Sequence, residues 1–261
     1  MYLEHWKLNE KPFDNTPDPK FLYLSSEHRE AVKRLTYAIS EHKGCALLTG
    51  EYGCGKTYLV RSIISQLDSD HYDLALINFP VFAPSEFLQE ILFQFGVDAK
   101  AGTRLELFHQ LAGHAFENHS KGKQSLVVID EAQMIEEARV FDEIRLMLNI
   151  QFEDRLLVDI FLVGQPELRE RIMKSPQLEQ RIGIKYHLHR LSQEETVQYV
   201  RHRLEIAGTT RDLFTNDAYV LLFKLSYGVA RRINNLCDLC LLEGASSGAT
   251  VIDEEIIRRV L

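Results

Sequence analysis

The chain has 261 residues, of which 45% are hydrophobic and 26% are charged, and its formal net charge is −8. These values are ordinary for a folded globular protein and exclude a disordered or fibrous chain. The negative charge provides no overall positive field that would hold nucleic acid or an anionic membrane non-specifically. No apolar run reaches the roughly 18–20 residues that a membrane-spanning helix needs. We therefore expect a cytoplasmic protein without a transmembrane segment, whose four cysteines are free thiols.

The first 25 residues are expected to form an ordered arm. Three prolines within eight positions, Pro12, Pro17 and Pro19, interrupt helical hydrogen bonding. No basic region followed by an apolar core precedes them, so a signal peptide is not expected. We predict that residues 1–25 lie over another surface of the protein, near the glycine-rich segment from Gly50 to Thr57.

From about residue 26 to residue 191, short apolar runs alternate with helical stretches. The runs lie at residues 45–49, 74–79, 126–129, 156–163 and 186–191. Apolar runs bounded by helices indicate a parallel sheet that is covered on both faces. We predict one α/β core domain over residues 26–191.

Beyond Leu191 the pattern becomes entirely helical. Ser192-x-x-Glu195 is a capping box that opens a helix. Further helical stretches are expected from Thr215 to Tyr227, from Ala230 to about Leu242, and from Asp253 onward. We predict a small all-helical domain over residues 192–261.

A glycine-rich motif directly follows the first predicted strand and opens a helix. It reads Gly50-Glu51-Tyr52-Gly53-Cys54-Gly55-Lys56-Thr57 and fits the pattern G-x-x-x-x-G-K-[ST]. Glycines let backbone N–H groups curl around phosphate oxygens, and the following helix start adds positive partial charge. Lys56 is expected to reach the β- and γ-phosphates of ATP, and Thr57 to ligate Mg²⁺. We expect this loop and the adjacent Tyr58 to bind nucleotide; a glycine-rich turn without a ligand is the alternative.

Two adjacent carboxylates, Asp130 and Glu131, follow the third predicted strand. A buried strand should not end in two acids unless something uses their charge. Asp130 fits the role of a Mg²⁺ anchor, and Glu131 fits that of polarising the attacking water. An Asp-Glu helix cap is the alternative.

Three further residues are candidates for the same site. Gln165 follows the fourth predicted strand, and strand ends of an open parallel sheet face the ligand crevice. Arg181 could reach the γ-phosphate of a neighbouring subunit, with Arg169 and Arg171 as competitors. Arg231 could fold back onto the bound nucleotide. The alternatives are that the Gln165 amide has no role in catalysis and that Arg181 and Arg231 are solvated surface residues.

Together these motifs resemble the AAA+ ATPases of the general secretion pathway protein A group, including versions linked to exopolysaccharide and exosortase loci and to type IV pilus assembly. The resemblance covers essentially the whole chain. Its segments are Met1-Tyr2, Pro12-Phe13, Thr16-Pro17-Asp18-Pro19, Phe21-Leu22-Tyr23-Leu24-Ser25, His28-Arg29-Glu30-Ala31, Asp130-Glu131-Ala132-Gln133, Leu146-Met147-Leu148-Asn149, Gly164-Gln165-Pro166-Glu167-Leu168, Gln180-Arg181-Ile182 and Arg231-Arg232-Ile233-Asn234-Asn235.

The resemblance implies a P-loop NTPase core with a parallel sheet, a helical lid, nucleotide at their junction, and a homo-oligomeric ring, often hexameric. It implies that Gln165 is the sensor-1 residue, Arg181 the finger acting in trans, and Arg231 the sensor-2 residue. Similar proteins usually carry proline where this chain has Ala230, which loosens the turn before Arg231.

The resemblance also assigns the adenine pocket to the segment from Leu22 to His28, with Tyr23 and His28 as contacts. Asn78 looks like the polar switch that holds Glu131 off its water. Secretion-pathway relatives often continue into a membrane helix and a peptidoglycan-binding domain. This sequence stops before them, so we do not expect a direct cell-wall role.

Three functions remain in competition. The first is a motor or switch in which ATP turnover remodels a protein partner of a bacterial secretion, pilus or exopolysaccharide system, in the cytoplasm or held at the inner membrane by that partner. The second is a DNA-binding targeting ATPase of the transposition type, which the charge of −8 disfavours. The third is a non-catalytic nucleotide sensor, against which Lys56, Asp130 and Glu131 argue.

The cysteines carry weaker signals. Cys237-x-x-Cys240 supplies only two ligands, and its spacing on a predicted helix favours packing over zinc or redox chemistry. Cys54 lies inside the phosphate loop, where its small size is the expected reason for it.

Overall fold

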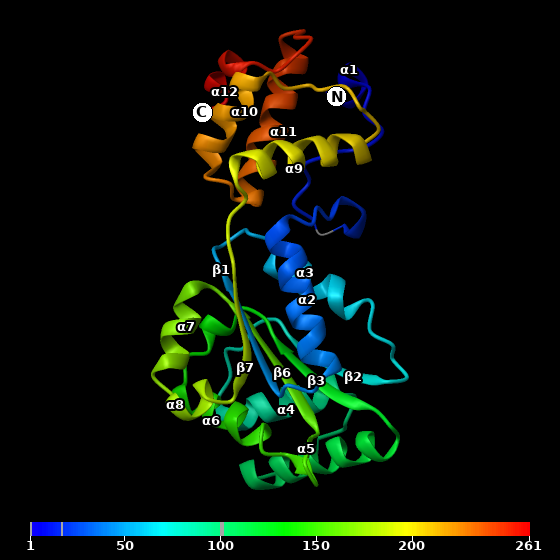
Figure 1. Ribbon diagram of the computed structural model, residues 1–261, viewed down its shortest axis with the longest axis vertical. Helices are drawn as coiled ribbons and strands as arrows, with labels where there is room; N and C mark the ends of the chain where they lie inside the picture. Colours follow the sequence, from blue (N-terminus) through cyan, green and yellow to red (C-terminus); the bar gives the residue numbers. More distant parts are fainter. Residues whose placement is uncertain (1, 17, 100–101) are drawn as a thin grey trace. The chain divides into compact units, whose positions relative to one another are not determined.

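The computed structural model describes residues 2–16, 18–99 and 102–261, so Met1 and Pro17 of the predicted arm lie outside the described residues. The chain forms two compact units (Figure 1). The α/β unit consists of Arg29–Gly50 and Leu59–Leu188. The helical unit consists of Met1–His28, Glu51–Tyr58 and His189–Leu261. The domain boundaries at residues 25 and 191 stay predictions.

Five parallel strands form the sheet of the α/β unit, in the order β2-β3-β6-β1-β7. Their bounds are β1 Cys45–Gly50, β2 Tyr72–Ile77, β3 Gln124–Ile129, β6 Val158–Gly164 and β7 Ile182–Leu188. The predicted α/β fold with a parallel sheet is confirmed. The register pairs Thr49 with Gly164 and Ile129 with Leu162, so β1, β6 and β3 end side by side at one edge.

Both faces of the sheet are buried, as uninterrupted apolar runs predict. Alternate residues of the strands, among them Leu47, Ile129 and Leu162, join one cluster with helices that follow β2, β3 and β6. Their neighbours on the other face, such as Leu48 and Val128, are also buried. The fifth strand, β7, starts at Ile182 and ends at Leu188, so it lies three to four residues earlier than the predicted strand at 186–191, and it is an edge strand. Edge strands alternate between buried and exposed residues and lack a clear apolar run.

The remaining elements of this unit connect the strands. The helices are α2 Ser26–Ser40, α3 Lys56–Ile64, α4 Pro84–Gln94, α5 Arg104–Ser120, η2 Ala132–Met134, α6 Ala138–Met147, α7 Pro166–Met173 and α8 Pro176–Glu179, of which α2 and α3 begin in the helical unit. A short antiparallel hairpin of β4 (Gln151–Phe152) and β5 (Arg155–Leu156) precedes β6 and was not expected from the sequence.

The helical unit consists of short helices around its own apolar cluster. They are α1 Tyr2–Trp6, η1 Pro19–Phe21, α9 Gln193–Ile206, α10 Asn216–Ser226, α11 Ala230–Ser246 and α12 Glu254–Arg259. The predicted capping box is confirmed, because Ser192 accepts from the N–H of Glu195, whose carboxylate accepts from the N–H of Ser192. Cys237 and Cys240 are free and buried in this cluster, where packing residues belong.

The N-terminal arm packs on the helices of the same unit. The buried indole of Trp6 donates to the carbonyl of Leu241, 2.8 Å away, and the arm is therefore ordered through specific contacts. A Cβ on Gly244 would stand 2.7 Å from the Trp6 ring, so α11 approaches the ring closely because it has glycine there.

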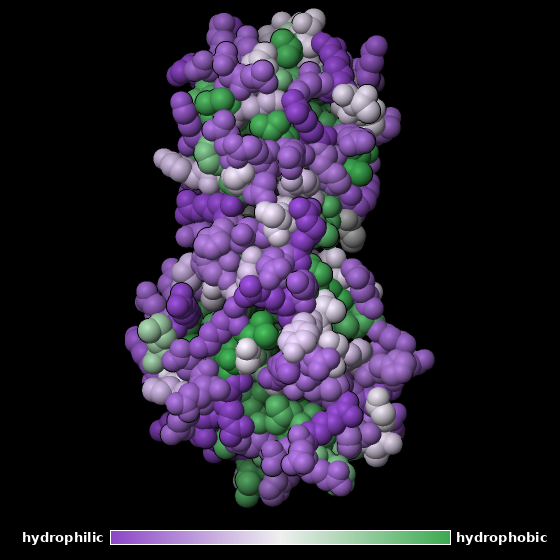
Figure 2. Space-filling view, in the orientation of Figure 1, coloured by the Kyte–Doolittle hydropathy of each residue, from purple (hydrophilic) through white to green (hydrophobic). Residues whose placement is uncertain are grey.

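Hydrophilic side chains cover most of the face shown in Figure 2, and smaller hydrophobic patches lie between them. Within the described ranges, no helix of this chain is both long enough and apolar enough to cross a membrane.

Candidate nucleotide-binding site

The glycine-rich loop has a backbone that only glycine adopts readily at two positions. Gly53 has a φ of +80° and Gly55 a φ of +92°. A Cβ on Gly53 would also stand 3.0 Å from Cβ of Arg231 and 3.1 Å from Cγ1 of Val229. Side chains at these positions would be strained or crowded, and the loop keeps its tight curl because it lacks them.

Lys56 closes this loop on itself. Its side chain is only 6% exposed, and its Nζ donates to the carbonyl of Glu51, 3.0 Å away. Burying an ammonium group is costly unless acceptors or anions compensate it. The half-buried Thr57 follows at the start of α3. A curled loop with a buried cation and a helix start has the chemistry that a phosphate chain needs.

His28 contacts the glycine-rich loop through a ring nitrogen, and its two hydrogen bonds define the tautomer of the ring. Its ring, 7% exposed, lies with Nε2 3.1 Å from the carbonyl of Cys54 and Nδ1 2.7 Å from the hydroxyl of Ser25. The carbonyl can only accept, so Nε2 carries the proton and Nδ1 accepts from Ser25. Burial lowers the pKa of His28, which keeps this neutral form.

Arginines of the helical unit contact the same loop. The backbone N–H of Arg231 donates to the carbonyl of Gly53 at 3.4 Å, and its guanidinium lies 4.8 Å from the ring centroid of Tyr52 and donates to the Tyr52 hydroxyl. Arg190 forms an ion pair with Glu51 at 3.4 Å. Of the predicted site residues, Arg231 is therefore brought beside the loop.

Two other predicted contacts of the nucleotide lie in the same unit. The hydroxyl of Tyr58 donates to the carbonyl of Asp18 in the arm. The hydroxyl of Tyr23 donates to Gln198 on α9, and its ring lies 5.9 Å from that of Tyr199. These contacts fix the rings against the arm and α9.

Asp130 and Glu131 stand at the carboxyl end of β3 in the α/β unit. The backbone N–H of Asp130 continues the pairing with β2 by donating to the carbonyl of Ile77 at 2.8 Å, and its side chain is 5% exposed. Glu131 has a φ of +51°, a left-handed conformation that is strained without glycine by about 1–3 kcal/mol. Such strain is typical of functional positions. Asn78, half-buried, directly follows β2 beside this pair.

Gln133 connects Glu131 to the end of β6. Its Nε2 donates to the carboxylate of Glu131, and its Oε1 accepts from the backbone N–H of Gln165 at 3.0 Å. Gly164 permits this approach, because a Cβ there would stand 2.6 Å from Oε1 of Gln133. Sequence reasoning assigned no role to Gln133. Its position in the Asp130-to-Gln133 segment was a signal, but the contact with β6 exists only in three dimensions.

The three candidate arginines of this unit differ in how they are held. Arg171 is half-buried and its guanidinium donates to the carbonyl of Ile135. Arg181 is exposed and donates to the carbonyl of Leu148 at 3.2 Å. Arg169 is exposed. An exposed guanidinium with a single backbone contact can turn outward more easily than a half-buried one.

The carboxyl edge of the sheet thus carries two acids and two amides that can bind a divalent cation and orient water. Gly50, where the glycine-rich loop starts, ends β1 at the same edge, and β6 separates β1 from β3 in the sheet. The rest of the loop, from Glu51 onward, belongs to the helical unit.

Residues 39–172 match the family model described as AAA domain. The chain is 38% identical over 254 residues to general secretion pathway protein A of Aeromonas hydrophila, which confirms the resemblance expected from the motifs. That match covers 95% of this chain and 46% of the relative, so the chain spans less than half of that protein's length. It is 22% identical over 298 residues to an uncharacterized HTH-type transcriptional regulator of Methanocaldococcus jannaschii, covering 98% of this chain and 72% of the relative.

Solved structures with a similar fold include the following three. The Aeropyrum pernix ORC2 protein in its ADPNP-ADP complexes has a TM-score of 0.68 and 19% identity, covering 97% of this chain and 71% of that one. Drosophila ORC bound to DNA has a TM-score of 0.72 and 17% identity, covering 100% of this chain and 65% of that one. The Thermotoga maritima RuvB Holliday junction branch migration motor has a TM-score of 0.62 and 19% identity, covering 92% of this chain and 72% of that one. At these identities the similarity shows a shared fold.

Proposed function

The chain belongs to the AAA domain family, and from this premise we propose that it binds ATP with Mg²⁺ and hydrolyses the β–γ phosphate bond. One observation carries the proposal most strongly. The loop that curls around the buried Lys56 follows β1 in the chain, Asp130 and Glu131 directly follow β3, and Gln165 directly follows β6. ATP hydrolysis needs a phosphate-binding loop, a metal anchor and an oriented water, and the chain has a candidate for each.

Each residue has a proposed role. Lys56 and the loop amides bind the phosphates, and Thr57 and Asp130 would hold Mg²⁺, which neutralises charge on the phosphate oxygens when bound. Glu131 polarises the attacking water, and Gln133 fixes the orientation of the Glu131 carboxylate through the hydrogen bond between them. Gln165 contacts the γ-phosphate or the water.

We assign the adenine contacts and the sensor-2 arginine to the helical unit. Tyr23 and His28 line the adenine side, and Arg231 contacts the phosphates and couples hydrolysis to motion of the helical unit. Arg231 touches the loop at Gly53 and Tyr52, which supports this assignment.

We further infer that the chain forms a ring, hexameric in the simplest case, and acts as a motor or switch on a protein partner of an envelope or export assembly. The similarity to general secretion pathway protein A supports this process. The proposed location is the cytoplasm, with attachment to the inner membrane through the partner.

The deciding experiment compares Lys56→Ala with Glu131→Gln. Lys56→Ala should abolish the heat of Mg-ATP binding in a calorimeter. Glu131→Gln should bind Mg-ATP like the parent and hydrolyse it about 10²–10⁴-fold more slowly, because it loses the group that polarises water. A Glu131→Gln variant that hydrolyses ATP at the parental rate would refute the assignment.

A DNA-targeting ATPase is the second candidate, because Drosophila ORC bound to DNA has a similar fold. ATP-stimulated and salt-dependent binding of duplex DNA would establish it. A pull-down with the Glu131→Gln variant, held in its ATP state, would instead recover the protein partner.

A further inference from the structure

A cavity of about 190 Å³ lies at the amino-terminal edge of the sheet, opposite the edge that carries Asp130 and Glu131. Its wall comes from segments that precede β1, β2, β3 and β6, which meet there because the strands are parallel. The residues that line it include His42, His71, Tyr72, His119, Lys123 and Arg155. They are rich in hydrogen-bond donors and belong only to the α/β unit.

Arg155 is held at this cavity by His42, which in turn contacts the buried carboxylate of Asp159. Asp159 is 2% exposed, and its Oδ2 lies 3.1 Å from Nδ1 of His42. Nε2 of the same ring lies 2.7 Å from a guanidinium nitrogen of Arg155. A guanidinium can only donate, so His42 is neutral, with its proton on Nδ1 and its Nε2 accepting from Arg155. This contact orients Arg155 and leaves four of its five N–H groups for other acceptors.

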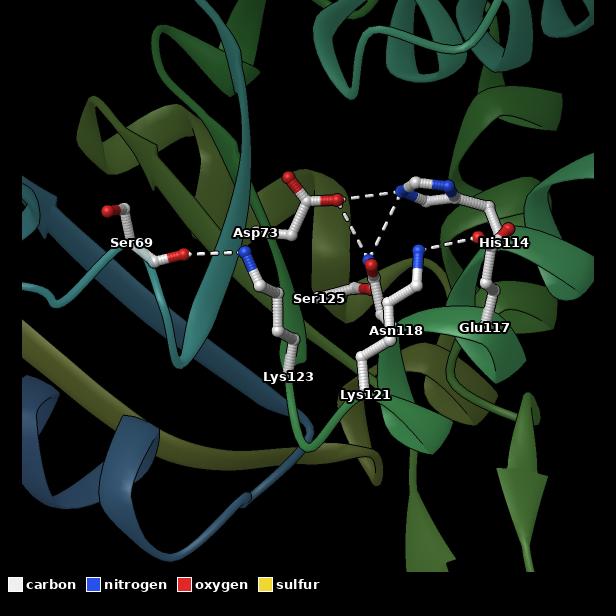
Figure 3. A network of polar contacts seen from close by, with 8 residues as sticks. All are labelled: Ser69, Asp73, His114, Glu117, Asn118, Lys121, Lys123 and Ser125. Carbon is white, nitrogen blue, oxygen red and sulfur yellow. Dashed lines mark hydrogen bonds and ion pairs between the residues drawn. The ribbon is translucent and has the colours of Figure 1, made fainter.

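Lys123 supplies the second permanent charge. Its Nζ donates to the carbonyl of Ser69 at 2.8 Å, as Figure 3 shows, which leaves two of its three N–H groups for other acceptors. The Tyr72 hydroxyl and the His119 ring nitrogens line the same cavity and have no hydrogen-bond partner among the described residues.

The nearby carboxylates are already satisfied, which argues against a cation. Asp159 accepts from His42, from the N–H of Gly44 and from Gln124. Asp68 accepts from His71 and from a backbone N–H. Within the described part of the chain, no three histidine, cysteine, aspartate or glutamate side chains are arranged to hold a metal ion. The cavity therefore offers the positive charges of Lys123 and Arg155, and the two nearby carboxylates are already paired.

We propose that this cavity binds a phosphate dianion, either inorganic phosphate or the phosphate of a small monoester. The charges of Lys123 and Arg155 match a dianion. A planar carboxylate could be satisfied by one guanidinium alone, whereas donors from several segments suit a tetrahedral group. The volume is several times the roughly 30 Å³ that one water occupies in the liquid, so a phosphate group fits.

The test is calorimetric titration of the full chain with inorganic phosphate, in parallel for four variants. Arg155→Gln and Lys123→Gln should each weaken binding about tenfold or more, because each removes a charge-assisted hydrogen bond. Lys174 is exposed and is not among the residues that line the cavity, so Lys174→Gln removes the same charge and should leave binding unchanged. Lys56→Ala removes the cation of the nucleotide loop, so the phosphate binding that remains in this variant is expected to come from the cavity.

Several results would overturn the proposal. Equal weakening by Lys174→Gln would indicate bulk charge, and loss of phosphate binding only in Lys56→Ala would indicate the nucleotide loop. Duplex DNA affinity that falls in Arg155→Gln while phosphate affinity stays constant would assign the cavity to a nucleic-acid surface. Titration with glycerol phosphate separates the two sources, since equal affinity supports a monoester and binding of inorganic phosphate alone supports the free ion. Thermal unfolding shows which variants fold, and either cavity variant suffices for the test.

Discussion

The buried imidazole of His28 donates through Nε2 to the carbonyl of Cys54, 3.1 Å away, in the middle of the glycine-rich loop. This bond joins the start of α2 to the residue between the two left-handed glycines, Gly53 and Gly55. A loop that must present N–H groups to phosphates has to direct its carbonyls elsewhere, and His28 gives one of them a donor. We therefore regard His28 as a positioning residue for the loop, in addition to its proposed place near adenine.

His28→Phe should weaken Mg-ATP binding about tenfold, because it leaves the Cys54 carbonyl without its donor. His28→Gln keeps an N–H group in its side chain and should lose less of the affinity for Mg-ATP. Isothermal titration calorimetry measures both, with His5→Gln as the control because His5 contacts the carbonyl of Ala249, far along the chain from the loop. Parental affinity in His28→Phe would remove His28 from the site.

Gly164 tests the contact between Gln133 and the end of β6. A Cβ on Gly164 would stand 2.6 Å from Oε1 of Gln133 and 2.8 Å from Cδ2 of Leu168, so Gly164→Ala must displace Gln133. We expect Mg-ATP binding to persist, turnover to fall at least about tenfold, and the free energy of unfolding to drop by about 1–3 kcal/mol. Steady-state hydrolysis and urea unfolding measure these effects.

Gly113→Ala is the matched control for Gly164→Ala. Gly113 lies within α5, and a Cβ there meets no atom within 4 Å. Alanine in a helix is more favourable than glycine by about 0.5–1 kcal/mol, so this variant should be slightly more stable and fully active. If both variants hydrolyse ATP at the parental rate, Gln133 does not act on Glu131.

The sequence predicted the elements whose signal is local. The glycine-rich motif, the apolar strands and the Ser192 capping box each depend on residues within a few positions. Strands β1, β2, β3 and β6 lie within two residues of their predicted bounds, and the cap lies where expected. The edge strand β7 was placed too late because its exposed face interrupts the apolar run.

Long-range relationships were out of reach. Nothing in the sequence pairs Gln133 with Gln165, 32 positions later, or Arg155 with His42, 113 positions earlier. Both contacts follow from the strand order. It brings the segments after β3 and β6 together at the carboxyl edge of the sheet, and the segments before β1 and β6 together at the opposite edge. The strain at Glu131 was equally hidden, because a positive φ at a glutamate has no composition signal.

Asp73 makes stability depend on pH. Its Oδ2 accepts from Nε2 of His114 at 2.7 Å and from Asn118 at 2.8 Å, and Asn118 also donates to Ser125 (Figure 3). Burial alone would raise the pKa of Asp73, but the hydrogen bonds from His114 and Asn118 outweigh it, and the net pKa shift is downward. A lowered pKa in the folded state means that ionised Asp73 stabilises the fold above its usual pKa of about 3.9, and this contribution is lost as pH falls through the folded pKa.

Asp73→Asn should therefore lower the free energy of unfolding by about 1–2 kcal/mol at pH 7, and the difference should shrink below about pH 4. Urea unfolding at both pH values measures it. Asp70→Asn, which alters an exposed carboxylate next to β2, should change neither value. A difference for Asp73→Asn that is the same at both pH values would contradict this account.

Arg181 is expected to complete the site of a neighbouring subunit. Its guanidinium is exposed and makes one backbone contact, to Leu148, so it can leave that contact at low cost. Arg181→Ala should bind Mg-ATP normally and lose about 10³–10⁵-fold in turnover, the range known for arginines that stabilise transition-state charge. Arg169→Ala, also exposed, should keep its turnover, whereas Arg171→Ala should lose stability because Arg171 holds the carbonyl of Ile135.

Mixing distinguishes action in trans from action within one subunit. Arg181→Ala subunits have an intact Lys56, and Lys56→Ala subunits have an intact Arg181, so neither hydrolyses ATP alone. In a mixed ring, a Lys56→Ala subunit can present its Arg181 to the nucleotide of an Arg181→Ala neighbour, and part of the parental activity should return. The activity should rise with the fraction of mixed interfaces, with a maximum near equal amounts. Mixtures that stay inactive although the subunits co-assemble would mean that Arg181 acts on its own nucleotide or on none.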